Sequence, residues 1–201
     1  MSYLSSELLA EESQTHRGPA RKFGPFHFYM ALREIASSGR IGRARISKAL
    51  GIGEGSVRTL LDLMEEKSLV KRNNAGIVLT DSGKALMERF PIRITRVGKC
   101  ELSVGKYSSL ALVRAGGRRI GNGIAQRDAA IKNGGDGAIT MVVRNGKLLL
   151  PPDFTYVTDT TINIAAFTTL GATDGDGAII GSGPTRVDSE KAAYHAALTL
   201  L

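Results

Sequence analysis

Hydrophobic residues between positions 41 and 83 are spaced as in a short helix and a longer helix followed by a hairpin. Three apolar residues at i, i+3 and i+4 mark the first helix: Ile46, Ala49 and Leu50. Gly51 follows them, where a left-handed residue commonly ends a helix. Apolar residues with the same spacing mark a second helix over 54–67, for which Gly53 is the N-cap: Val57, Leu60, Leu61 and Met64. The pattern predicts a helix-turn-helix.

Polar side chains occupy the opposite side of the second predicted helix. They are Ser56, Arg58, Thr59 and Asp62. Such a helix can enter the major groove of DNA, where arginine forks onto guanine and short hydroxyls reach bases or phosphates. Two β-prone runs around residues 73–76 predict a hairpin. Its stalk carries Lys71 and Arg72, which can hold phosphates beside the groove.

The runs SKALGIGEGSVRTLLDLMEEKSLV and IVLTDSGKALM resemble those of winged-helix transcriptional regulators, over roughly residues 25–90. In that family an L-G-[IV] turn precedes the recognition helix, and L-T-x-x-G-x-x-L follows the wing. The resemblance implies that Ser56, Arg58 and Thr59 read bases and that Lys71 and Arg72 serve as wing contacts. Gly53 and Gly55 depart from the family, which usually has Ser, Thr or another helix former there.

The net charge of +8 and the isoelectric point near 9.8 favour a polyanionic partner, although residues 1–90 and 91–201 each carry +4. Before the turn, four cations occur with no acid among them: Arg40, Arg43, Arg45 and Lys48. A first helix that crosses the DNA backbone needs such charges, so Arg43 and Arg45 are predicted contacts to double-stranded DNA. The alternative is that the winged helix is a protein-interaction module, with Arg58 merely a solvated side chain.

The composition changes at Pro91, which is the predicted domain boundary. Residues 1–23 are interpreted as a flexible tail, 24–90 as the winged helix and 91–201 as a small α+β domain. In 24–90, a helix starting at Pro25 buries Phe28, Tyr29, Leu32, Ile35 and Ala36, and Thr80 caps a helix that runs to Arg89. Candidate strands in 91–201 are Ile92–Val97, Leu110–Arg114, Ala138–Arg144, Lys147–Leu150, Thr161–Thr168 and Ala178–Gly181. Two candidate helices cover one face of the sheet: Gly123–Asn133, capped by Asn122, and Ser189–Leu200, capped by Asp188 or Ser189.

A glycine- and arginine-rich stretch over 116–123 follows a predicted strand and opens a predicted helix. Bare backbone, a helix N-terminus and arginines can hold a small anion. The predicted ligand-binding residues are Gly117, Arg118, Arg119, Asn122 and Arg127. The spacing matches neither a dinucleotide-binding fingerprint nor a phosphate loop, so a flexible turn with surface charges is the alternative. A Gly-Asp-Gly-Ala-Ile run occurs at 135–139 and again at 175–179, which indicates two similar turns into strands or a duplicated half-domain.

The sequence shows no motif for a catalytic residue, a metal site or a cofactor. The three histidines are scattered and no nucleophile motif is present. Cys100 is the one cysteine, which fits a reducing cytosol, and no apolar run is long enough to span a membrane. We therefore predict a cytoplasmic, homodimeric DNA-binding transcriptional regulator with an anionic effector. The rival is a small-molecule enzyme with an accessory winged helix, in which Asp136 or Asp176 would be an acid or base.

Overall fold

A computed structural model describes residues 22–98, 101–157 and 164–201. The chain divides into two compact units, with the division between Phe90 and Pro91. Cys100 and all but the last two residues of the predicted 1–23 tail lie outside the described residues.

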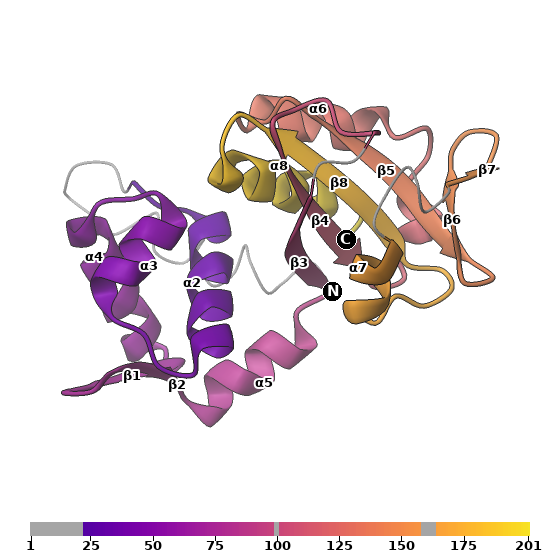
Figure 1. Cartoon of the computed structure of the whole chain (residues 1–201). Helices are drawn as coiled ribbons and strands as arrows, with labels where there is room; N and C mark the ends of the chain where they lie inside the picture. Colours follow the sequence, from indigo (N-terminus) through magenta and orange to yellow (C-terminus); the bar gives the residue numbers. More distant parts are fainter. Residues whose placement is uncertain (1–21, 99–100, 158–163) are drawn as a thin grey trace. The chain divides into compact units, whose positions relative to one another are not determined.

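The first unit has the element order of a winged helix (Figure 1). Its elements are α2 (Pro25–Ser38), α3 (Arg43–Leu50), α4 (Glu54–Glu66), β1 (Val70–Asn73), β2 (Gly76–Leu79) and α5 (Asp81–Arg89). β1 and β2 form an antiparallel hairpin, the wing, in which Val70 lies opposite Leu79. A single bridge between Ile41 and Ile77 joins the wing to the segment before α3.

Local signals account for the ends of these helices. Gly51 ends α3 in the left-handed conformation, with φ of 68°, and Gly53 is the extended N-cap of α4. The Thr80 hydroxyl accepts a hydrogen bond from the Gly83 main-chain N–H and so caps α5. One expectation for α2 was wrong: Ala36 is exposed, because the buried residues of this helix end at Ile35 and Ala36 lies in its last turn.

The second unit is a six-stranded antiparallel sheet in the order β3-β4-β8-β5-β6-β7. The strands are β3 (Ile92–Val97), β4 (Tyr107–Val113), β5 (Gly137–Arg144), β6 (Lys147–Leu150), β7 (Thr155–Tyr156) and β8 (Gly177–Gly183). Both Gly-Asp-Gly runs lead directly into strands, β5 and β8, which pair with each other.

Helices cover the sheet from both sides. A 3₁₀ turn, η1 (Gly116–Arg119), precedes α6 (Ile124–Lys132), which packs with α8 (Arg186–Leu198) over β5, β8 and β4. The Ser109 and Ser189 hydroxyls meet across the α8 side at 2.8 Å. The opposite side is apolar and buries Phe167 of α7 (Ile164–Thr169) against Leu110, Met141 and Ile180.

Three details of the predicted second unit were wrong. Residues 164–168 of the predicted strand Thr161–Thr168 belong to helix α7, and residues 161–163 lie outside the described part of the chain. Burial of Phe167 outweighs the β-preference of the threonines around it. Thr185, rather than Asp188 or Ser189, caps the last helix, because its hydroxyl accepts from the Asp188 N–H. Gly123 occupies the N-cap position of α6, and Asn122 contributes through its side-chain oxygen, which accepts from Ile124.

Candidate nucleic-acid interface

The N-terminal half of α4 presents polar side chains to solvent. Val57, Leu60, Leu61 and Met64 are buried, which turns Arg58 and Thr59 outward and leaves Ser56 half-buried. The Thr59 hydroxyl donates to the Gly55 carbonyl at 3.3 Å. Within the described residues Arg58 makes no ion pair, so its guanidinium is available to a partner.

Main chain is openly accessible at the start of α4. A Cβ atom on Gly53 or Gly55 would meet nothing within 4 Å. Glu54 is occupied by Arg43, whose Nε lies 3.2 Å from its carboxylate. Without side chains at these two positions, the unpaired N–H groups at the positive end of the helix are open to an approaching anion.

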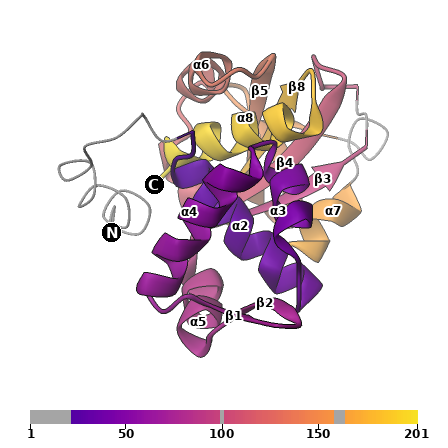
Figure 2. The ribbon, with the colours of Figure 1, turned by 90° about the vertical axis from the view of Figure 1, so that its left-hand side faces the viewer.

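The cations of α3 differ in their availability. Arg43 is engaged with Glu54, whereas Arg45 and Lys48 are exposed and have no ion pair among the described residues. Figure 2 shows α3 and α4 side by side on the viewer's side of this unit, with the wing below them.

The two predicted wing contacts have different surroundings. Lys71 is exposed and has no ion pair in the described part of the chain. Arg72 folds back onto α4, with Nη1 2.6 Å from Asp62 and Nε 2.8 Å from Glu65. Hydrogen bonds from Arg72 hold the pKa of Glu65 below its usual value, and the same contacts raise the pKa of Arg72. Arg72 therefore neutralises acids on the C-terminal half of α4.

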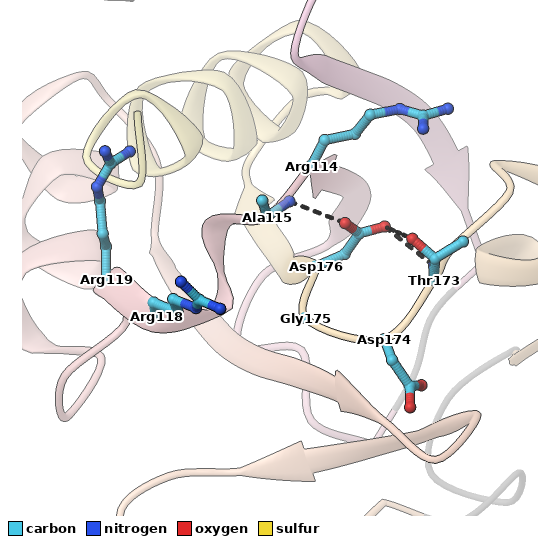
Figure 3. A pocket seen from close by; sticks show the side chains of 8 residues that line it. All are labelled: Arg114, Ala115, Arg118, Arg119, Thr173, Asp174, Gly175 and Asp176. Atoms are coloured by element: carbon cyan, nitrogen blue, oxygen red, sulfur yellow. Dashed lines mark hydrogen bonds between the residues drawn. The ribbon is translucent and has the colours of Figure 1, made fainter.

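In the second unit, two of the predicted ligand-binding residues line an open pocket of about 650 Å³ (Figure 3). Its lining consists of Arg114, Ala115, Arg118, Arg119, Thr173, Asp174, Gly175 and Asp176. Arg119 is occupied, because its guanidinium donates to the main-chain oxygens of Leu200 and Leu201. Gly117 is packed against Gly175, whose carbonyl accepts its N–H at 2.9 Å.

Both aspartates of this pocket are engaged in holding turns. The buried Asp176 accepts from the Ala115 N–H and from the N–H and hydroxyl of Thr173. Asp174 accepts from Asn145 and Gly146 at the hairpin after β5, and these hydrogen bonds hold its pKa below the usual value. Figure 3 shows the side chains of Arg114 and Arg119 extending in different directions. The arginines therefore do not converge on one ligand position.

Comparison with known proteins gives a separate match for each unit. Residues 27–92 match the family model described as the CggR N-terminal DNA binding domain. Residues 104–200 match a model described as a domain of unknown function (DUF4443). No curated protein matches the chain.

The first unit has the element order of a winged helix, and the model that it matches describes a DNA-binding domain. The whole chain is also similar to a solved structure, a hypothetical protein (PH0730) from Pyrococcus horikoshii OT3. The match has 26% sequence identity and a TM-score of 0.65, and covers 86% of this chain and 91% of that one. Thus a winged helix similar to a DNA-binding domain precedes an α+β unit similar to a domain of unknown function. Within the described residues no helix is long and apolar enough to cross a membrane.

The remaining predicted ligand residues, Asn122 and Arg127, line a second and smaller pocket of about 180 Å³ beside α6. The structure thus divides the predicted ligand set between two places. Sequence reasoning missed Arg114 and Thr140, which line the larger and the smaller pocket. Thr140 carries no motif, and only the pairing of β5 brings it to α6.

Proposed function

We propose that the protein is a transcriptional regulator that binds duplex DNA as a homodimer and responds to a small anionic effector. The winged helix would place the N-terminal half of α4 in the major groove. There, Arg58 and Thr59 face base edges, with Ser56 beside them. The observation that carries the proposal is the exposed Arg58, without an ion pair in the described residues, next to an open helix N-terminus.

The residues proposed to hold phosphates differ from the set predicted from the sequence. Arg45, Lys48 and Lys71 hold phosphates, since they are exposed and carry no ion pair within the described residues. Arg43 joins them only by exchanging Glu54 for a phosphate. Arg72 contributes indirectly, because it cancels carboxylates of α4 that would otherwise repel the DNA backbone.

Two winged helices in a two-fold dimer would bind half-sites about one helical turn apart. An effector at the second unit alters DNA binding only if it has different affinities for the DNA-competent and DNA-incompetent arrangements. Sedimentation of the full chain on a palindromic duplex tests the dimer directly.

A salt titration tests the DNA-binding proposal. Anisotropy of a labelled duplex from the gene's own upstream region is compared with that of a shuffled duplex. The upstream duplex should bind more tightly, and three or four phosphate contacts per winged helix give a slope of log K against log salt of about −3 to −4 per bound protomer. Equal affinity for both duplexes, or affinity independent of salt, would contradict the proposal.

A further inference from the structure

We propose that the pocket between the N-terminus of α6 and the open edge of β5 binds a small α-amino acid with a short apolar side chain. The inference rests on the proposed function, because it names the chemical class of the anionic effector proposed there. The pocket lining has one cation and no acid: Asn122, Gly123, Ile124, Arg127, Ala138, Ile139, Thr140, Leu150 and Pro151.

The first half of β5 has one unpaired edge. β5 pairs with β8 from Gly137 to Val142, but with β6 only from Val142 to Arg144. The main-chain groups of Val143 bond on the β8 side, to Asp176 and Gly175. Because these groups alternate in direction along a strand, those of Ala138 and Thr140 point to the open edge.

Proline prevents β6 from closing this edge. The strand ends at Leu150, and the next two residues are Pro151 and Pro152, which have no N–H to donate. Continuing the β5–β6 register would place Pro151 opposite Thr140. The Thr140 carbonyl is therefore left as an acceptor at the rim of the pocket.

The Thr140 hydroxyl is the strongest indication of a ligand. The residue is 4% exposed, and its Oγ1 has no hydrogen-bond partner in the structure as described. A Cβ on Gly123 would lie 3.9 Å from this oxygen, so the hydroxyl lies under the first turn of α6. Buried hydroxyls are normally paired, and a bound polar group would supply the missing partner.

The helix end supplies the complementary donors. The first N–H groups of a nine-residue helix such as α6 have no acceptor within the helix, and Asn122 satisfies only that of Ile124. Arg127 lies in this first turn, paired at 3.5 Å with Asp128. Both partners are about half exposed, so an incoming carboxylate can replace this weak ion pair.

These groups together match an amino acid. Its carboxylate binds the α6 N-terminus and Arg127. Its ammonium donates to the Thr140 hydroxyl and to the strand-edge carbonyl, while its side chain lies against Ile139 and Leu150. The volume of about 180 Å³ is smaller than pockets for drug-sized ligands and excludes a nucleotide.

Calorimetry on the full chain, without DNA, tests the proposal with L-alanine, L-valine and L-leucine. At least one should bind saturably, one per chain, with a dissociation constant below about 10 mM. Isovalerate, which lacks the ammonium group, should bind roughly tenfold more weakly than L-valine, and inorganic phosphate still more weakly.

Thr140→Val retains the side-chain shape and removes the hydroxyl. It should weaken amino-acid binding about five- to tenfold without lowering the melting temperature of the free protein, since no protein hydrogen bond is lost. Arg127→Ala should weaken binding about tenfold. Arg118→Ala, in the larger pocket, is the matched control and should bind as the unmodified chain does.

The proposal is overturned if none of the three amino acids binds. It is also overturned if Thr140→Val binds them normally, or if phosphate binds instead and is lost in Arg118→Ala. Since DNA is absent from the assay, saturable amino-acid binding supports this inference even if the duplex titration fails. Normal duplex binding without amino-acid binding refutes this inference alone.

Discussion

At Gly181 the main chain of α8 approaches β8 so closely that a larger residue has no space. A Cβ atom there would lie 2.2 Å from the Ala193 nitrogen. The next nearest atoms, the Ala193 Cα and the Ser189 oxygen, also belong to the main chain and cannot rotate away. Gly183, two residues further along the same strand, is packed in the same way against Asp188 and Ser189. The absence of side chains at these positions sets the separation of helix and sheet.

Replacing this glycine should strongly destabilise the second unit. We expect Gly181→Ala to lower the free energy of unfolding by about 2–4 kcal/mol, because helix and sheet must separate. Urea denaturation followed by circular dichroism measures the effect. Gly98→Ala is the control, since its Cβ would meet nothing within 4 Å. A loss at Gly181 no larger than that of the control would show that the packing is looser than described.

Elements with a clear period could be predicted from the sequence. The apolar spacing of α4 and the turn at Gly51 are local properties, and the structure confirms both. The threonine-rich residues of α7 could not be assigned in this way, because the burial of Phe167 depends on strands far away in the sequence. The start of α8 could not be predicted to the residue, because Thr185 and Asp188 can each accept a capping hydrogen bond. In the structure Thr185 accepts it.

Contacts between elements changed the interpretation of the wing. Arg72 and Glu65 are seven residues apart, and only the return of β1 along α4 brings the guanidinium to the two carboxylates. From the sequence alone, Arg72 was equivalent to Lys71. The structure separates them into a bound and an exposed cation.

The Arg72 cluster should stabilise the fold in a pH-dependent way. The folded-state pKa of Glu65 lies below its ordinary value of 4.5, so its contribution is present above that pH and is lost as the pH falls through the folded value. Arg72→Met should therefore unfold at lower urea than the unmodified chain at neutral pH, with a difference that shrinks below about pH 4.5.

Lys71→Met removes the adjacent cation, which has no ion pair in the described residues, and is the control for this series. Its urea midpoint should differ little from that of the unmodified chain at any pH. A deficit in Arg72→Met that is the same at pH 3 as at pH 7 would show that the ion pairs do not cause it.

At the scale of the whole molecule, the two units differ in how far their sites could be predicted. The polar side of α4 follows from helical periodicity, so Arg58 could be named from the sequence. The ligand residues could not be assigned to one pocket, because distant parts of the chain occupy some of them. The main-chain oxygens of Leu200 and Leu201 accept hydrogen bonds from Arg119, and the Gly175 carbonyl accepts one from Gly117. Asn122 and Arg127 instead line the pocket beside the open edge of β5.

The central claim is that α4 reads duplex DNA through Arg58. The most direct measurement is the affinity of Arg58→Ala for the upstream duplex, by anisotropy at fixed salt, beside Lys84→Ala, which removes an exposed cation from α5. Loss of a bidentate guanine contact should weaken Arg58→Ala about 10- to 100-fold and reduce its preference over the shuffled duplex, while Lys84→Ala remains within a fewfold of the unmodified protein. Equal affinities for the two variants, with the sequence preference intact, would contradict the account.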